Sequence, residues 1–330
     1  MLFVSTGAGP RELVAAETHA VDAVQRAVWI DLVNPTDAER SLVERGTGLR
    51  VPAREDLDEI ETSSRLNVEH GALYLSTPMG YLDADGMAQA RPLGLVLSDK
   101  VLLTVRFAEA RVFDQYSVRF SEQFAETGGH PCSSEAFLGL LDGMVDRLAD
   151  ILEQIRGELD AISQRVFRPE AARANAAKTD LQLRATLRSI GRAGDRLSTL
   201  RDSLLGVQRI LQFTGEKTVA FMPVDVRPRL QPLRQDITSL MEYDGQLSNK
   251  VQFLLDATLG FINIEQNNSI KILTVVSVVG VPPTLVASIY GMNFKWIPEL
   301  QWEYGYFYGL AVIVLTGAVP YFWFKRKGWI

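Results

Sequence analysis

The sequence predicts an α+β domain followed by a long stalk helix and two C-terminal transmembrane helices, and three observations support this fold class. Residues 1–107 alternate short β-branched stretches with turn residues. Beyond them, apolar residues recur at helical spacing. The chain then closes with two uncharged apolar segments, residues 272–290 and 304–324. We therefore expect a membrane protein with a large soluble domain on the cytosolic side.

The N-terminal region is predicted to be a mixed α/β domain with a small sheet. Residues 28–33 are apolar and β-branched, as in a strand. Thr36 and Glu39 follow with the spacing of a capping box, so a helix should begin directly after Thr36. Further strands are expected at residues 73–77, 93–97 and 101–105.

The middle of the chain is predicted to be helical. One helix should cover residues 134–167, and a second, rich in arginine, residues 176–213. Residues 214–227 read as a connection, after which a helical pattern meets no proline from about residue 232 until Pro282. A helix of this length is typical of a stalk. The expected domains are a cytosolic domain at 1–215, a stalk at 216–271 and a transmembrane domain at 272–330.

The two apolar segments are each long enough to cross a bilayer, which takes about 20 residues. The expected division is a first span at 272–290, an outer loop at 291–303, a second span at 304–324 and a basic tail at 325–330. Two such segments at one end of a chain argue against the alternative of buried core helices. Basic residues flank the cytosolic ends, so the positive-inside rule places both termini in the cytosol.

Two helices cannot enclose a polar pathway, so transport would require several copies of the chain. In the first span, a seven-residue repeat that starts at Asn267 selects one face, four of whose six further members are Ser or Thr. These six are Ile270, Thr274, Ser277, Val281, Thr284 and Ser288. The alternative is that these hydroxyls only bond back to the backbone or join helices. Pro282 and Pro283 leave backbone carbonyls without partners in mid-membrane. Such carbonyls are found where a helix lines a pathway and also where it only has a kink.

The outer end of the first span reads Tyr-Gly-Met-Asn at residues 290–293. Gly291 exposes a carbonyl and Asn293 offers a neutral oxygen. A ring of such oxygens could hold the water shell of Mg²⁺, an ion that dehydrates reluctantly. By composition alone the segment is also an ordinary helix end.

Residues 290–293, together with Pro-Glu-Leu at 298–300 and a second span that ends in Phe-Lys-Arg-Lys-Gly-Trp at 324–329, resemble the CorA family of magnesium transporters. Residues 260–267, 282–288, 29–32 and 57–61 are similar to its enterobacterial branch. The resemblance implies a funnel-shaped homopentamer in the bacterial inner membrane. It also implies passive uptake of Mg²⁺, with Co²⁺ and Ni²⁺ as substitutes, under the control of cytosolic Mg²⁺, and no enzymatic activity.

The resemblance also implies roles for individual residues. Gly291 and Asn293 would form the outer selectivity filter, with Met292 fixing the turn. Thr284 and Asn267 would form polar rings, while Ile270, Leu273 and Val281 would form a hydrophobic constriction that closes by dewetting. Glu299 would attract cations to the mouth, or it is a plain surface acid. The sensing acids do not carry over cleanly, and the candidates are Asp236, Glu242 and Asp244, with a solvated stalk face as the alternative.

Other functions have less support in the sequence. A net charge of −6 argues against a nucleic-acid partner. An enzyme is disfavoured because the chain lacks a phosphate-binding glycine-rich loop, has one cysteine and has three scattered histidines. No organic cofactor is expected. The alternatives are a proton-coupled zinc transporter of the ZntB type and a structural membrane scaffold.

Overall fold

The computed structural model describes residues 1–6, 9–13, 19–59, 65–82, 88–127, 132–167, 176–217, 222, 226–293 and 297–329. These residues form two compact units. The first contains residues Met1–Phe167 and Arg188–Leu254, and the second contains Arg168–Leu187 and Leu255–Ile330. Residues 60–61 and 294–296, and residues 218–221 and 223–225 of the predicted connection at 214–227, lie outside the described residues.

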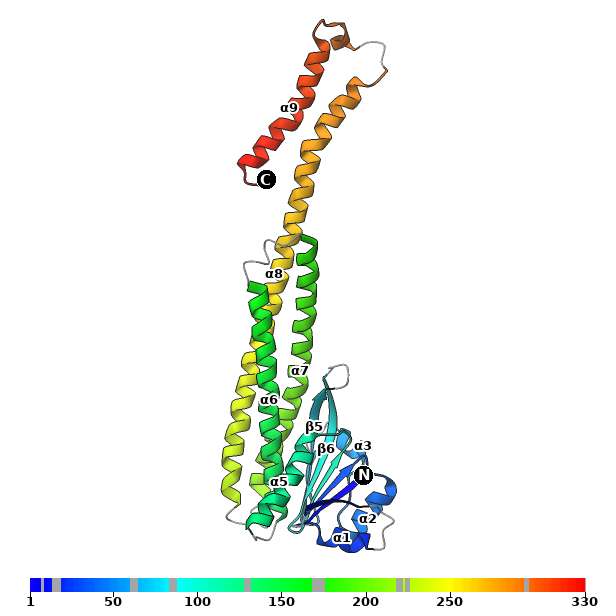
Figure 1. Cartoon of the computed structure of the whole chain (residues 1–330), viewed down its shortest axis with the longest axis vertical. Coiled ribbons are helices and arrows are strands. Elements are labelled where there is room, and N and C mark those ends of the chain that lie inside the picture. Colours follow the sequence, from blue (N-terminus) through cyan, green and yellow to red (C-terminus); the bar gives the residue numbers. More distant parts are fainter. Residues whose placement is uncertain are drawn as a thin grey trace. The chain divides into compact units, whose positions relative to one another are not determined.

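The first unit begins with a seven-stranded sheet in the order β2-β1-β3-β7-β6-β5-β4 (Figure 1). Only the central pair, β3 and β7, is parallel, and all other neighbours are antiparallel. The sheet is thus larger than the small one expected. Its strands are β1 (Leu2–Thr6), β2 (Gly9–Leu13), β3 (Trp29–Val33), β4 (Leu66–Glu69), β5 (Ala72–Leu82), β6 (Ala88–Leu97) and β7 (Leu102–Arg106).

Helices cover both faces of this sheet. One core cluster joins the sheet to the short helices, and it includes Ile30, Val43 and Val105. On the other face, the Trp29 indole packs edge-on against Phe120 of α5 with ring centroids 6.2 Å apart. Every residue of β3 and β7 is buried, as expected for strands covered on both sides. The covering helices are α1 (Ala20–Arg26), α2 (Asp37–Thr47), α3 (Arg54–Asp58) and α5 (Arg111–Thr127).

The predicted start of α2 is confirmed at the level of single hydrogen bonds. The Glu39 backbone N–H donates to the Thr36 hydroxyl at 3.3 Å, and the Thr36 N–H donates to the Glu39 carboxylate at 2.8 Å. This capping box satisfies two of the N–H groups that a helix start leaves without partners. The helix ends at Gly48, whose φ of 74° favours glycine.

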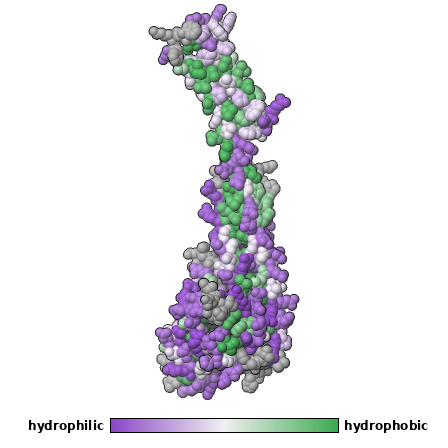
Figure 2. All heavy atoms as spheres, turned by 180° about the vertical axis from the view of Figure 1, so that it is seen from behind, coloured by the Kyte–Doolittle hydropathy of each residue, from purple (hydrophilic) through white to green (hydrophobic). Residues whose placement is uncertain are grey.

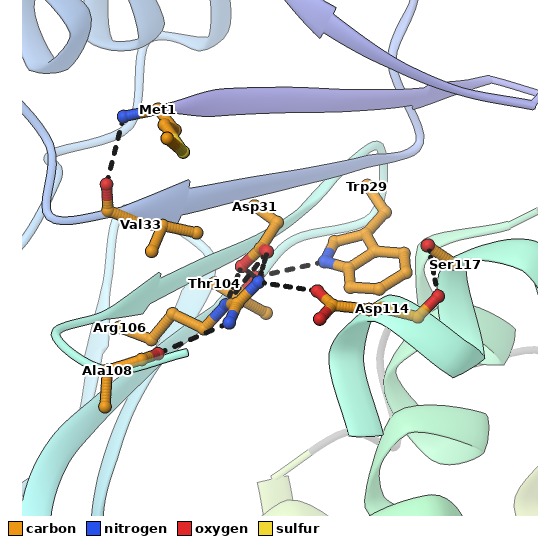
Figure 3. A network of polar contacts seen from close by, with 9 residues as sticks. All are labelled: Met1, Trp29, Asp31, Val33, Thr104, Arg106, Ala108, Asp114 and Ser117. Atoms are coloured by element: carbon orange, nitrogen blue, oxygen red, sulfur yellow. Dashed lines mark hydrogen bonds and ion pairs between the residues drawn. The ribbon is translucent and has the colours of Figure 1, made fainter. Parts of the chain in front are cut away.

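A buried ion-pair network joins β3 and β7 to α5 (Figure 3). The Arg106 Nε donates to Asp31 at 3.0 Å, and its Nη2 lies 3.1 Å from Asp114 Oδ1. The Thr104 hydroxyl donates to Asp31 at 2.6 Å and accepts the Trp29 indole N–H at 3.1 Å. Burial raises the pKa of Asp31, and the guanidinium of Arg106 opposes this effect.

Long helices make up most of the remaining chain: α6 (Ser133–Phe167), α7 (Ala176–Lys217), α8 (Leu230–Tyr290) and α9 (Gly305–Arg326), with the short turns η3 (Arg227–Arg229) and η4 (Pro298–Gln301). Helix α7 extends to Lys217, beyond its predicted end at residue 213, and it continues through Gly215. The predicted long helix is confirmed, since α8 is continuous from Leu230 to Tyr290.

Ion pairs join the three long helices within the first unit. Arg196 of α7 pairs with Glu158 of α6, and Lys250 of α8 pairs with Asp160 of α6. Arg201 of α7 donates to Asp244 of α8 at 2.6 Å. These contacts fix the first part of α8, which is the helix that continues into the second unit.

Candidate ion pathway

Two helices are long and apolar enough to cross a membrane: the one that contains α8, and α9. Figure 2 shows apolar residues concentrated on the surface of α9 and the end of α8, whereas the surface of the first unit is largely polar. Leu273 and Val314 are examples of this exposed apolar surface, at 67% and 64% exposure. Because water would not favour so much exposed apolar surface, these helices fit the two predicted spans.

Helix α9 lies against one face of α8 at the two prolines. A Cβ placed on Gly317 would lie 3.1 Å from the Pro283 side chain and 3.6 Å from the carbonyl oxygen of Val279. Near the outer end, a Cβ on Gly309 would lie 4.0 Å from the Tyr290 ring. The glycine at position 317 lets the two helices come close, as small residues do in membranes, whereas position 309 has room for a Cβ.

The residues of α8 that α9 covers are spaced at whole helical turns. They are half-buried in a part of the helix where most side chains are exposed, and they are Val275, Val279, Pro283, Val286 and Tyr290. At 3.6 residues per turn, this row defines a single face of α8. The opposite face is therefore free in one copy of the chain.

The predicted pathway residues lie on that opposite face, about half a turn from the covered row. All except Thr274, which is half-buried, are exposed in the single chain: Asn267, Ile270, Leu273, Ser277, Val281, Thr284 and Ser288. The structure thus brings the predicted residues together along one side of α8. Whether they line a pathway depends on what covers this side, so their role stays a prediction.

The hydroxyl groups on this face bond mainly to their own helix. The Thr274 hydroxyl donates to the Ile270 carbonyl at 2.8 Å, and the Ser288 hydroxyl donates to Thr284 at 2.8 Å. The Thr284 hydroxyl donates to Val281 at 2.8 Å. This is the alternative interpretation of the Ser and Thr pattern, and it holds in the single chain. The oxygen lone pairs still face outward and can accept a hydrogen bond from water.

At its outer end α8 stops in a tight turn. The Gly291 N–H donates to the Ala287 carbonyl at 3.0 Å, and the Met292 N–H donates to Ile289 at 3.2 Å. A Cβ on Gly291 would lie 3.3 Å from the Ala287 oxygen, so a larger residue would press on the helix end. Asn293 follows in an exposed position, and its amide has no partner among the residues that the structure describes.

The outer loop beyond this turn contains Glu299 in the short helix η4. Its side chain is half-buried rather than fully exposed. Its carbonyl oxygen accepts the Trp302 N–H at 3.3 Å, so the backbone of Glu299 also helps to form the turn before α9. The proposed attraction of cations by Glu299 stays a prediction.

The three candidate sensing acids lie in different surroundings. Asp236 and Glu242 are exposed, whereas Asp244 is buried and its Oδ2 accepts from Arg201. Burial raises the pKa of Asp244, and Arg201 opposes this effect. Within the described residues, one chain holds no group of three acids or histidines that could bind a metal ion. A site built from Asp236 or Glu242 would need ligands from a second copy.

Sequence reasoning missed an acidic row beside Asp236. Asp142, Asp146 and Asp150 follow one another at four-residue spacing on α6. Partial burial, the two neighbouring carboxylates and the more distant Asp236 raise the pKa of Asp146. The spacing was visible in the sequence, but the approach of α8 to α6 was not.

The family described as CorA-like Mg2+ transporter protein matches this chain over residues 24–326. The Magnesium transport protein CorA of Escherichia coli strain K12 is 36% identical over 318 residues, which are 96% of each chain. The protein of the same name from Yersinia pseudotuberculosis is 35% identical over 309 residues, 94% of each. The solved CorA magnesium transporter of Methanocaldococcus jannaschii, 19% identical, superimposes with a TM-score of 0.75 and covers 100% of this chain and 99% of that one.

Proposed function

This chain belongs to the CorA family of magnesium transporters, and from this premise we propose that it forms a pore for the passive entry of Mg²⁺. Magnesium transport is the activity named for relatives that match nearly its full length. The family likeness extends to the fold, because the sheet, the long helices and the two apolar helices all match a solved relative.

The single observation that carries the mechanism is the uncovered face of α8. Helix α9 covers the row with Val279 and Val286, and the opposite row ends at Gly291 and Asn293. In a bilayer, copies of α8 that met along this row would enclose a path lined by neutral oxygens and apolar side chains. We propose that Mg²⁺ follows this path.

The chemistry of the row suits a hydrated ion. At the mouth, Gly291 carbonyls and Asn293 amides would accept hydrogen bonds from the water shell, which Mg²⁺ gives up reluctantly. Neutral oxygens bind weakly, and conduction requires sites that release the ion. Further inward, exposed Ile270, Leu273 and Val281 form apolar rings that would exclude water when the pore narrows. Co²⁺ and Ni²⁺ of similar size would use the same path.

The assembly and orientation follow from this mechanism. One α8 cannot surround an ion, so the working unit is a homo-oligomer, and we propose a pentamer. Basic residues at 325–327 and Lys271 would hold the inner ends of the spans at the cytosolic face of the inner membrane. Both termini would then be cytosolic, and Asn293 would face outward.

We propose that cytosolic Mg²⁺ closes the pore through acids between neighbouring copies. Asp236 is the best placed of the three candidates, because it is exposed and lies near the acidic row of α6. Crowded carboxylates repel one another until a cation lies between them. Asp244 is the least available, because Arg201 already neutralises it. Loss of Mg²⁺ would leave the acids unscreened and loosen the closed arrangement.

The test is Mg²⁺ entry into proteoliposomes that contain a Mg²⁺-sensitive dye, with Asn293→Ala compared with the unmodified chain. Gln301→Ala is the matched control, because it also removes an exposed amide from the outer loop. Asn293→Ala should abolish most of the flux, whereas Gln301→Ala should leave it unchanged. Size-exclusion chromatography verifies that each variant assembles.

Two results would reject the proposal. Equal Mg²⁺ flux in the Asn293→Ala variant and the unmodified chain would show that Asn293 is not part of a selectivity filter. Absence of Mg²⁺ flux, together with Zn²⁺ entry that depends on a proton gradient, would support the ZntB-type alternative instead.

A further inference from the structure

A cavity of about 280 Å³ lies in the first unit, and no residue of the α8 pathway row lines it. Strand β5, the first turn of α5, and helices α6 and α7 form its walls. Most of its lining is apolar, and the apolar residues are Met79, Val112, Met144, Leu148, Ile151 and Leu200. Its volume is just below the range for sites that bind drug-sized ligands, about 300–1,000 Å³, so it suits a small ligand.

Three arginines converge on this apolar cavity, against a single lining carboxylate, Glu109. Arg111 and Arg147 are exposed, and no carboxylate in the described part of the chain lies within ion-pair distance of either guanidinium. Arg196 is 12% exposed and pairs with Glu158 at 2.5 Å. Its Nε is buried and has no hydrogen-bond partner within the described residues. A buried donor without a partner is costly, and Arg196 lines the cavity with part of its side chain.

The start of α5 adds donors to the same place. Residues 110–112 line the cavity, and α5 is a helix of 17 residues that begins at Arg111. The Phe113 N–H donates to the Ala110 carbonyl at 3.0 Å, whereas the N–H groups before it have no partner within the helix, and the helix dipole favours an anion there. Phosphate groups often bind at such a helix start. The guanidinium groups and the helix start therefore favour the same kind of ligand group.

We propose that this cavity binds a small phosphate monoester that carries a planar or apolar group, the class of the nucleoside monophosphates. Arg111 and Arg147 would hold the phosphate in the bidentate geometry that guanidinium groups favour. The apolar body would lie against Leu148 and Leu200. The cavity is too small for the two acyl chains of a membrane lipid, which favours a soluble ligand.

Such a ligand would join elements that are far apart in the sequence. Beside the cavity, the Gly80 N–H of β5 donates to the Ser203 hydroxyl of α7 at 2.9 Å. A ligand in contact with β5, α5, α6 and α7 would strengthen this junction. Because it binds only the folded chain, it would raise the melting temperature.

The test is isothermal titration calorimetry of the full chain in nanodiscs with four probes: adenosine monophosphate, glycerol 3-phosphate, inorganic phosphate and adenosine. Glycerol 3-phosphate represents a lipid headgroup without a planar group. Adenosine monophosphate should bind more tightly than each of the others. The double variant Arg111→Ala/Arg147→Ala should weaken its binding by about tenfold or more, because hydrogen bonds to charged groups are lost.

Arg45→Ala is the matched control, because it removes an exposed arginine from α2, which contributes nothing to the cavity. It should leave binding unchanged. Arg111 and Arg147 are exposed, so their replacement should leave the melting temperature without ligand unchanged. The proposal is overturned if no probe gives saturable binding. Equal binding of phosphate and adenosine monophosphate, or equal loss in the double variant and in Arg45→Ala, would also overturn it.

Discussion

Replacement of Gly317 by valine should impair Mg²⁺ flux, because α9 packs tightly against α8 at this residue. A Cβ at this position would lie 3.1 Å from the Pro283 side chain, closer than an ordinary van der Waals contact. The carbonyl oxygen of Val279 lies 3.6 Å from the same point. A β-branched side chain would therefore meet α8 at the turn where the prolines interrupt its hydrogen bonds.

The magnitude follows from the space available. An alanine at Gly317 requires Pro283 to move by a small amount, so the effect of Gly317→Ala should be mild. Valine adds two methyl groups and should cost about 1–3 kcal/mol, the usual range for overpacking. Since van der Waals contact is a main source of helix association in a bilayer, the result should be a displaced α9 and a less stable α8.

Gly309→Ala is the control, because a Cβ there would lie 4.0 Å from the Tyr290 ring, an ordinary contact distance. Flux into proteoliposomes is measured for both variants, normalised to the assembled protein that elutes from size-exclusion chromatography. Melting temperature in detergent gives a second readout. Normal flux and an unchanged melting temperature in Gly317→Val would refute the reasoning, as would equal damage in Gly309→Ala.

Three further predictions concern charge and gating. Arg106→Met should destabilise the chain by about 3–5 kcal/mol, because it leaves the buried carboxylate of Asp31 without its ion-pair partner. In thermal denaturation, the double variant Arg106→Met/Asp31→Asn should recover part of the lost stability. The pKa of Asp146 is raised, so the folded chain binds more protons than the unfolded chain above the ordinary carboxyl pKa, and stability falls as pH rises through that window. Asp146→Asn should therefore raise the melting temperature more at pH 7 than at pH 4; equal gains would contradict this. Leu273→Ser should let water into the apolar ring, so Mg²⁺ should leak through the pore even at high internal Mg²⁺. If the variant shows no more Mg²⁺ flux than the unmodified chain under this condition, the constriction is not at Leu273.

The sequence predicted the long helices well and the sheet poorly. Helices are specified by residues close together in the sequence, whereas a sheet depends on pairing between distant segments. The capping box of Thr36 and Glu39 involves residues three apart, so its pattern is visible along the chain. Strands β1 and β2 were missed. Their residues carry little pattern of their own. Strand β1 pairs with β3, which is distant in sequence, and β2 pairs with β1 at the edge of the sheet. The limits of α5 were missed for a similar reason, since its buried face is defined by contacts such as that between Phe120 and Trp29.

For the candidate site, the sequence predicted which residues share one face of α8, but not which parts of the other helices contact α8. The helical period fixes which residues share one side of α8, so the row from Asn267 to Ser288 could be selected before the structure was known. The contact of Gly317 with Pro283 depends on how far α9 slides along α8, which no local pattern encodes. The pairing of Asp244 with Arg201 likewise depends on how α7 and α8 pack, so its burial was not visible in the sequence.

The asparagines and the hydroxyl groups on this side of α8 differ in their hydrogen bonding. Thr284 and Ser288 already donate to their own helix, so they could face lipid at little cost. Asn267 and Asn293 are exposed at the two ends of the row, and neither amide has a partner within the described residues. Both asparagines lie just beyond the predicted first span at 272–290, so water at the two faces of the bilayer can satisfy their amides. If copies of α8 surround water along this row, these amides lie at the two ends of the water path, which is the arrangement that a hydrated Mg²⁺ requires.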